Sequence, residues 1–418
     1  MVRLNLIVVS IALVLNLLDG YDVVAMSFTV DAIGRELQIP VERLGIVFSV
    51  ALAGMMVGSL FLAPLSDSIG RRSLTLVCVA VIGSSMVATA FVTNLWQLVL
   101  CRALTGLGVG AMLASLTALC SEYASPRYQS LAVMAMTAGY PLGATIGGLL
   151  AARLLPNYGW NSIFLLGGAA TLSMLILVYV WVPESAEYLL ARRPKGALKS
   201  YNTIRRRLGD PPLSKLPKLH AQDTVKPARV SSLLRSEFRR KTLSLWATFF
   251  FCVMGVYFLL SWIPKLGIDA GLTESQGAYA SSLHSAGGVL GILTVGLLAA
   301  RLSIFLVISA SLLIASSTML LFAGTNNLDH LYVYLIVIGF FLHGGFTGLY
   351  AVAAKLYPVT IRGTGIGWAI GLGRLGAVIG PYIGGLMISN GFSMGQSFTY
   401  FAIPVLMAAM LAFQLKTS

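Results

Sequence analysis

Apolar runs of about twenty residues recur along the whole chain, and this repetition restricts what the chain can fold into. An α-helix of about twenty residues is long enough to cross a bilayer. Only 11% of the residues are charged, whereas about 25% are charged in an average soluble domain. The sequence therefore predicts an all-α polytopic membrane protein.

The runs predict twelve membrane-spanning helices, divided six and six by one long polar stretch. We expect an N-terminal six-helix bundle at 1–183, a cytoplasmic central loop at 184–240 and a C-terminal six-helix bundle at 241–418. The predicted spans are residues 4–30, 44–64, 73–92, 96–121, 129–152, 160–182, 241–264, 276–300, 303–324, 331–354, 364–386 and 396–415.

The net charge of +14 is distributed unevenly among the loops. With both termini inside, the inner side carries 23 Lys and Arg residues, 15 of them between 184 and 241, and the outer side carries 4. Lys and Arg collect on the cytoplasmic side of membrane proteins, so we predict cytoplasmic termini. The same distribution favours a cytoplasmic loop over a nucleic-acid surface, and we expect no nucleic-acid partner.

Two aspartates, Asp19 and Asp22, interrupt the first apolar run. A carboxylate at mid-bilayer depth costs roughly 3 kcal/mol, and the run is too long and too interrupted for a cleaved signal sequence. Residues three apart share one helix face, so both side chains should point into a polar bundle interior. A helical rise of about 1.5 Å per residue places Arg102, in the fourth span, level with Asp22. We expect an Asp22–Arg102 ion pair, with outward snorkelling of Arg102 as the alternative.

Arg374 lies near the middle of the eleventh span, and the second half has no acidic residue at that depth. A guanidinium can donate two parallel hydrogen bonds to a carboxylate, so we predict that Arg374 binds an anionic substrate. His343, Tyr140, Phe346 and Tyr350 lie at similar depth and are the other candidates for the substrate site. For His343, a role in packing alone stays open.

Two residues near this layer are not assigned to a site. His284, in the eighth span, is as compatible with packing as with ligand or proton binding. Trp262, near the outer end of the seventh span, is expected to anchor that helix at the membrane–water interface.

A glycine row is repeated in the two halves. Glycines at four-residue spacing, from Gly139 to Gly147, recur at one constant offset in the second half, from Gly376 to Gly384. Small residues at this spacing let helices approach closely in lipid, so packing alone is one interpretation. Matching rows in duplicated halves are also typical of transporters.

The inner loop at 67–72 reads Asp-x-x-Gly-Arg-Arg and resembles the major facilitator superfamily, as does Pro-Glu-Ser at 183–185. The resemblance implies the major facilitator fold, with twelve helices in two pseudo-symmetric halves and a breakable charge network on the inner side. Ordinary positive-inside anchoring or solvated loop charge is the alternative. The gating residues that the resemblance implies are Asp67, Arg71, Arg72, Glu122 and Arg127.

Asp-Gly-Tyr-Asp at 19–22 and Gly-x-Gly-Arg-x-Gly at 371–376 together resemble the aromatic acid:proton symporter family. The resemblance extends over essentially the whole chain. It implies a bacterial inner-membrane importer of a benzoate-, hydroxybenzoate- or phenylpropionate-like carboxylate, working by alternating access. It also implies that Asp19, Asp22 and Arg102 serve proton coupling, with the proton gradient as the energy source and no cofactor.

The loop at 296–304 departs from the family, because it has neither the aspartate nor the second glycine expected there. Three other functions stay open: a carrier of a non-aromatic organic acid, a drug-exporting antiporter and a transporter-like ligand sensor. The 4 cysteines lie in apolar spans, and no nucleophile–base or metal-ligand pattern occurs in the sequence. We expect neither an enzyme nor a metal site, and a monomeric protein.

Overall fold

Long α-helices make up nearly all of the computed structural model, which describes residues 2–124, 128–208, 211–217, 230–325 and 328–417. No β-strand occurs among these residues, and eleven of their helical stretches are long and apolar enough to cross a membrane. One stretch, Ala132–Trp181, has 50 residues, more than twice what one crossing needs. It turns at Gly159, where φ is 71° and ψ is 174°, and therefore makes two passes. The prediction of twelve passes is confirmed.

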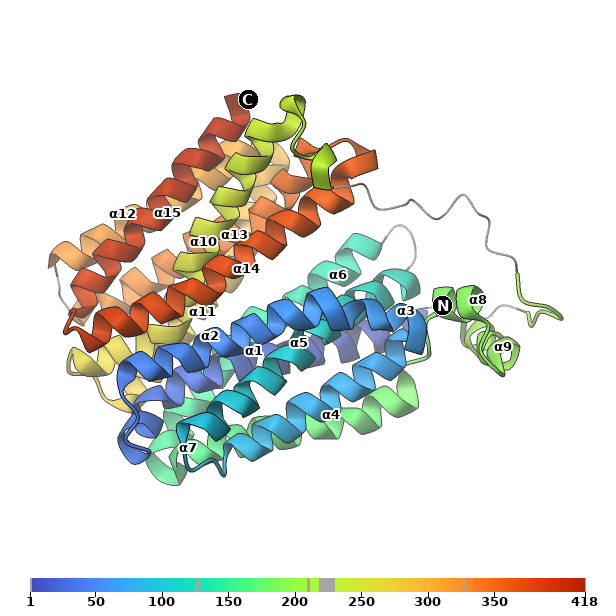
Figure 1. The fold of residues 1–418 in the computed structure, drawn as a ribbon, viewed down its shortest axis with the longest axis horizontal. Coiled ribbons are helices and arrows are strands. Elements are labelled where there is room, and N and C mark those ends of the chain that lie inside the picture. Colours follow the sequence, from blue (N-terminus) through green and yellow to red (C-terminus); the bar gives the residue numbers. More distant parts are fainter. Residues whose placement is uncertain (1, 125–127, 209–210, 218–229, 326–327, 418) are drawn as a thin grey trace. The chain divides into compact units, whose positions relative to one another are not determined.

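The helices of the first six passes are followed by those of the last six (Figure 1). The first set comprises α1 (Val2–Glu36), α2 (Val41–Val57) with its continuation η1 (Gly58–Leu62), α4 (Arg71–Thr89), α5 (Leu95–Tyr123), α6 (Gln129–Thr137) and α7 (Gly139–Trp181). The second set comprises α10 (Ser236–Asp269), α11 (Glu274–Arg301), α12 (Ile304–Thr325), α13 (Leu331–Leu356), α14 (Val359–Ser389) and α15 (Met394–Thr417). Short elements between them are η2 (Ala63–Leu65), α3 (Ser66–Ile69), α8 (Ala186–Arg192), α9 (Ala197–Leu208), η4 (Val230–Ser232) and η5 (Leu328–His330).

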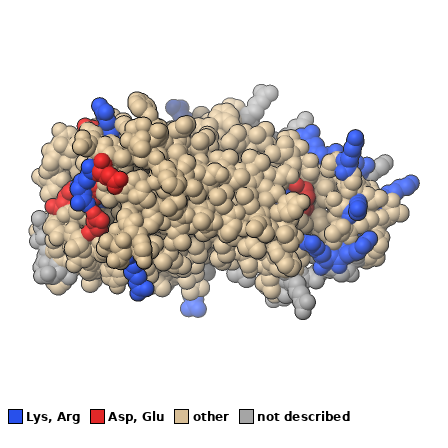
Figure 2. Space-filling view, turned by 90° about the horizontal axis from the view of Figure 1, so that it is seen from below, with Lys and Arg blue, Asp and Glu red and all other residues tan. Residues whose placement is uncertain are grey.

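The polar stretch predicted as a loop contains two helices, α8 and α9. Figure 1 shows both at the end of their bundle where α3 lies, and α8 packs against α3. Ile204 of α9 is buried, whereas Lys199, Arg206 and Arg207 are exposed. Figure 2 shows many Lys and Arg side chains at the right of the view, others mixed with Asp and Glu at the left, and wide stretches of surface that carry few charged side chains.

Contacts divide the chain into two units, each of which is described by itself. Unit 1 comprises Met1–Asp22, Ala53–Gly143 and Phe164–Thr224, and unit 2 comprises Val23–Leu52, Ala144–Ile163 and Val225–Ser418. The division cuts α1, α2 and α7. The division into halves at 183 and 241 therefore remains a prediction from the sequence.

The glycine row packs helices together in the same way in both units. Gly139 and Gly143 of α7 lie directly against α1, where a Cβ would collide with the backbone at Leu13 and Leu17. The same contact recurs between α14 and α10, with both partners shifted along the chain by the same offset. The later pairs are Gly376 with Phe250 and Gly380 with Met254.

A second pair of helices repeats its contacts at a slightly different offset. Gly54 and Gly58 lie against α5 at Ala103 and Leu107 in unit 1. The corresponding glycines in unit 2 join α11 to α13, and each glycine and its partner follow the unit 1 pair at the same offset along the chain. They are Gly287 with Ile336 and Gly291 with Phe340. The packing interpretation of the glycines is therefore correct, and the repetition of both partners supports a duplicated bundle.

Candidate functional site

The buried residues Asp22 and Arg102 form an ion pair within unit 1. The distance from Arg102 Nη1 on α5 to Asp22 Oδ1 on α1 is 2.8 Å, and only 2% and 5% of the Arg102 and Asp22 side chains are exposed. Arg102 Nη2 also donates to the Thr89 hydroxyl at 2.9 Å, and its guanidinium carbon lies 5.1 Å from the centre of the Phe164 ring. The pairing expected from helix depth is present, while its part in proton coupling remains a prediction.

Because the pair is buried, a change in the charge of either residue changes the free energy of the contact between α1 and α5. Each ion costs several kcal/mol to remove from water, and mutual attraction and hydrogen bonds offset that cost. A proton on Asp22 would leave the Arg102 guanidinium, which also contacts the Thr89 hydroxyl and the Phe164 ring, without the charge of this carboxylate. Protonation of Asp22 would thus weaken this contact between α1 and α5.

Asp19 lies one helical turn earlier on α1 and is also buried, with 2% of its surface exposed. Its neighbour Gly20 abuts the backbone of Tyr140 on α7, where a Cβ would collide. Asp19 thus stands beside the contact of α1 with α7, whereas Asp22 contacts α5. The two carboxylates have different surroundings, and we expect different effects from substituting them.

Arg71 and Glu122 are the centre of a charge network at the turn between α3 and α4. Arg71 pairs with Glu122 of α5 and, at 2.9 Å, with Glu187 of α8. Glu122 also accepts hydrogen bonds from the Ser185 hydroxyl at 2.8 Å and the Ala186 amide at 3.1 Å. One guanidinium and two carboxylates therefore connect α4, α5 and α8.

Glu184 is a further acceptor in this network. Its carboxylate accepts from the backbone amides of Arg72 and Ser185, at 2.9 and 2.8 Å. The Arg72 guanidinium lies 5.1 Å from the centre of the Tyr179 ring and also donates to the Tyr179 carbonyl. The Tyr123 hydroxyl donates to the Glu184 carbonyl at 2.6 Å. The Pro-Glu-Ser run thus contributes to the same network as the inner loop.

Within the described ranges, the structure assigns no such contact to the Asp67 side chain, although its backbone carbonyl accepts from Arg192 Nε at 3.0 Å. Arg127 lies outside the described residues. A gating role for either side chain remains a prediction.

Both the backbone conformation at position 70 and the adjacent Glu184 carboxylate favour glycine over larger residues. Its φ of 98° is rarely adopted by other residues, and the Glu184 carboxylate occupies the place of a Cβ. We expect Gly70→Ala to cost about 1–3 kcal/mol of stability, measured as thermal unfolding in detergent. Gly196→Ala is the matched control, because Gly196 has a φ of 81° and nothing within 4 Å of a Cβ. Equal losses in both variants would contradict a need for the Glu184 contact.

The turn between α11 and α12 in unit 2 has no comparable network among the described residues. α11 ends at Arg301 and α12 begins at Ile304. The Arg301 side chain is exposed and forms no ion pair in the described ranges. This agrees with the missing aspartate and glycine of the loop at 296–304.

In unit 2, Arg374 of α14 lies near Tyr350, which belongs to an aromatic cluster. The centre of the Tyr350 ring is 5.6 Å from that of Phe346 and 5.5 Å from that of Phe249. The charge of Arg374 acts on the Tyr350 phenol. No carboxylate of the part of the chain that the structure describes lies within ion-pair distance of Arg374. A partly exposed guanidinium beside aromatic rings can bind a ring that carries a carboxylate.

Three of the five predicted substrate residues thus lie together: Arg374, Phe346 and Tyr350. His343 lies one turn before Phe346 on α13, but only 6% of it is exposed. Its ring packs against that of His284 on α11, with 5.2 Å between the ring centres. Tyr140 belongs to unit 1 and remains a prediction for the substrate site.

A cluster of five charged residues, the ion cluster, joins α1, α10 and α11 within unit 2. Asp31 pairs with Arg35 at 2.8 Å and with Lys265 at 2.9 Å. Lys265 also pairs with Asp269, and Arg35 with Glu274. The sequence does not predict this cluster, because α1 ends at Glu36 and α10 begins only at Ser236. The available signal was that Arg35 and Lys265 are two of the few basic residues expected outside.

Trp262 is fully buried, and the interface anchoring expected for it is wrong. Its Nε1 donates to the Pro381 carbonyl at 2.9 Å, and its ring meets Phe48 edge-on at 5.2 Å. The indole also lies against Gly384 and Gly385 of α14. The glycine row leaves room for this large ring between helices, so the side chain packs inside the unit.

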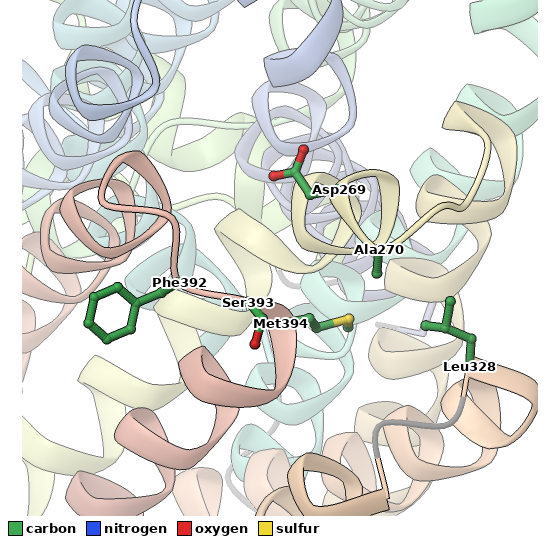
Figure 3. A pocket seen from close by; sticks show the side chains of 6 residues that line it. All are labelled: Asp269, Ala270, Leu328, Phe392, Ser393 and Met394. Atoms are coloured by element: carbon green, nitrogen blue, oxygen red, sulfur yellow. The ribbon is translucent and has the colours of Figure 1, made fainter.

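A small pocket of about 200 Å³ lies at the ends of several helices in unit 2 (Figure 3). It lies between the end of α10, η5 and the loop that precedes α15. None of the predicted substrate residues lines it. The lining residues are Asp269, Ala270, Leu328, Phe392, Ser393 and Met394.

Comparisons with known proteins identify the family and the fold of the chain. The family model of the Major Facilitator Superfamily matches residues 12–327 and 245–417. The 4-hydroxybenzoate transporter PcaK of Pseudomonas putida is 34% identical over 414 residues, which cover 96% of this chain and 90% of that protein. The gallate transporter of the same organism is 31% identical, covering 97% and 90%. A solved D-xylose–proton symporter shares the fold, with a TM-score of 0.78 at 16% identity over 98% of this chain and 97% of that one. The chain therefore belongs to the major facilitator superfamily and, within it, to the aromatic acid transporters.

Proposed function

We propose that this protein imports a small aromatic carboxylate together with protons, by alternating access. The observation that carries the proposal is the partly exposed Arg374 guanidinium, which interacts electrostatically with Tyr350 of the Phe346–Tyr350 ring pair and has no paired carboxylate among the described residues. The substrate carboxylate would bind Arg374, and its ring would pack against the two aromatic side chains. The names of the relatives, which include transporters for 4-hydroxybenzoate, gallate and benzoate, support an aromatic acid.

Asp22 is the proposed carrier of the coupling proton. A proton there removes the charge that Arg102 contacts at 2.8 Å and so loosens α1 from α5. Moving an anion inward against an inside-negative potential costs about 2.3 kcal/mol per 100 mV, and one proton cancels that charge. The proton gradient therefore serves as the energy source in place of a cofactor. Asp19, beside the contact of α1 with α7, is the second candidate.

The proposed location is the bacterial inner membrane, with both termini in the cytoplasm. The excess of 23 inner over 4 outer basic residues supports this orientation. The Arg71 network would then lie on the cytoplasmic side and the ion cluster on the outer side. Alternating access requires each set of contacts to break in turn. Because one chain contains both duplicated bundles, we propose a monomer.

Uptake by the purified protein in proteoliposomes tests this proposal. The substrates are radiolabelled 4-hydroxybenzoate, gallate, benzoate and two aliphatic acids, with and without an acidic exterior. We expect accumulation of aromatic acids that requires the gradient and is abolished by a protonophore. Uptake at the same rate and to the same level with and without the proton gradient would contradict symport. A preference for aliphatic acids, export against proton entry, or binding without uptake would instead indicate a non-aromatic carrier, an antiporter or a sensor.

A further inference from the structure

A buried polar group of four side chains lies within unit 2, on α11 and α13. Ser281, His284 and Ser285 come from α11 and His343 from α13, and all are at most 6% exposed. The hydroxyls of both serines and Nε2 of both histidines have no hydrogen-bond partner among the described residues. Buried polar atoms without partners are rare in native proteins. We therefore infer that these side chains do more than fill space between the helices.

The two imidazole rings lie close together, and the hydrogen-bond partner of His284 defines its tautomer. Their ring centres are 5.2 Å apart at an interplanar angle of 58°. His284 Nδ1 lies 3.2 Å from the Leu335 carbonyl, which can only accept a hydrogen bond, so Nδ1 carries the hydrogen. Nε2 of neutral His284 thus keeps its lone pair available for a proton. Glycines at 288 and 339 give the rings this room, because a Cβ would lie 2.9 Å from the His343 ring and 3.1 Å from His284 Nδ1.

Within the described ranges, no fixed charge of the neighbouring helices balances a proton on this pair. α12 carries no ionisable residue, and α7 meets α11 at Gly148 beside Ser282. On α10 and α14, Cys252, Tyr257 and Arg374 are the ionisable residues that interact electrostatically with Tyr350 of α13, and none of them is a carboxylate. Among the described side chains, His343 is the titratable group that acts on His284. Burial opposes an isolated charge, so the pair stays neutral until a counter-ion arrives.

The substrate anion is such a counter-ion. His343, Phe346 and Tyr350 follow one another on a single face of α13, at spacings of three and four residues. Tyr350, beside Arg374, is about 10 Å along the helix from His343. A carboxylate on Arg374 would therefore add a negative charge near Tyr350, about 10 Å along α13 from the histidine pair.

We propose that His284 and His343 together form a second proton-binding site, which fills when the anion binds. One proton from water adds to an Nε2 lone pair and produces one imidazolium within the pair, and no other bond changes. Because linkage is reciprocal, the anion strengthens proton binding and the proton strengthens anion binding by the same factor. This inference rests on the proposed function, since it requires that the protein binds an aromatic anion.

Proton uptake per bound anion measures the site directly. Purified protein in weakly buffered detergent solution with a pH indicator dye receives 4-hydroxybenzoate, and the bound amount is measured in parallel. We expect His284→Gln and His343→Gln to take up about one proton fewer per bound anion than the wild type. His330→Gln is the matched control, because His330 is exposed at the start of α13, and it should equal the wild type.

A second measurement leaves the pair intact and so does not depend on folding of the variants. His220→Gln/His330→Gln retains His284 and His343 as the only histidines of the chain. With isotope-labelled histidine, infrared difference spectra should show imidazolium bands on addition of 4-hydroxybenzoate. An unchanged proton count in the pair variants, or spectra without imidazolium bands, would overturn the second site alone. A wild type that binds none of the aromatic acids would overturn both this site and the proposed function.

Discussion

Asp22→Asn is expected to abolish uptake driven by a proton gradient, while exchange of preloaded substrate continues. Asparagine cannot gain or lose a proton, and it leaves the Arg102 charge without the carboxylate that lies 2.8 Å away. Breaking a buried ion pair costs about 3–5 kcal/mol, so thermal stability should fall as well. Accumulation of 4-hydroxybenzoate with an acidic exterior, compared with counterflow at equal pH, measures the two activities separately.

Two further variants separate coupling from stability. Thr89→Ala removes another contact of the same guanidinium without removing a titratable group, so uptake should persist with a loss of about 1 kcal/mol. Asp22→Asn/Arg102→Gln removes the stranded charge and should recover thermal stability, but not accumulation. Accumulation by Asp22→Asn at the wild-type level would show that another group carries the proton.

Depth in the membrane can be predicted from the sequence because it follows from helical rise alone. Counting residues places Asp22 and Arg102 level, and a buried arginine at that depth has few carboxylates to choose from. The glycine row is predictable in both halves because small residues at four-residue spacing leave a repeated pattern. These features depend on position along one helix.

Contacts between helices cannot be predicted in the same way, because depth does not say which faces meet. Glu122 of α5 pairs with Arg71 of α4, and the depth of the two residues alone does not predict that these side chains meet. The depth of Trp262 predicts a place at the interface, yet the side chain faces the glycines of α14 and is buried. The ion cluster likewise joins helix ends far apart in sequence. Such pairings depend on the rotation of each helix about its own axis. Hydropathy does not determine this rotation when apolar residues occupy every face of a helix.

Arg374→Gln is expected to weaken binding of 4-hydroxybenzoate by about 10–100-fold, because each hydrogen bond to a charged group contributes about 1.5–3 kcal/mol. Arg374→Lys keeps the charge but loses the planar fork, so an intermediate loss is expected. Equilibrium binding in detergent at fixed pH measures both. Thermal stability should stay within about 0.5 kcal/mol of the wild type, because the described residues contain no carboxylate that the substitution would strand.

This stability result distinguishes a substrate ligand from a structural ion. Asp22 and Arg102 hold each other, so either single substitution should reduce stability even without ligand. Arg374 lacks such a partner among the described residues. Substituting it should therefore change stability only when the anion is present, where the ligand-induced rise in unfolding temperature should be smaller. Arg301→Gln, which removes an exposed charge at the end of α11, is the matched control and should leave binding unchanged. Wild-type affinity in Arg374→Gln, or a large loss of stability without ligand, would mean that Arg374 serves the fold and that the carboxylate binds elsewhere.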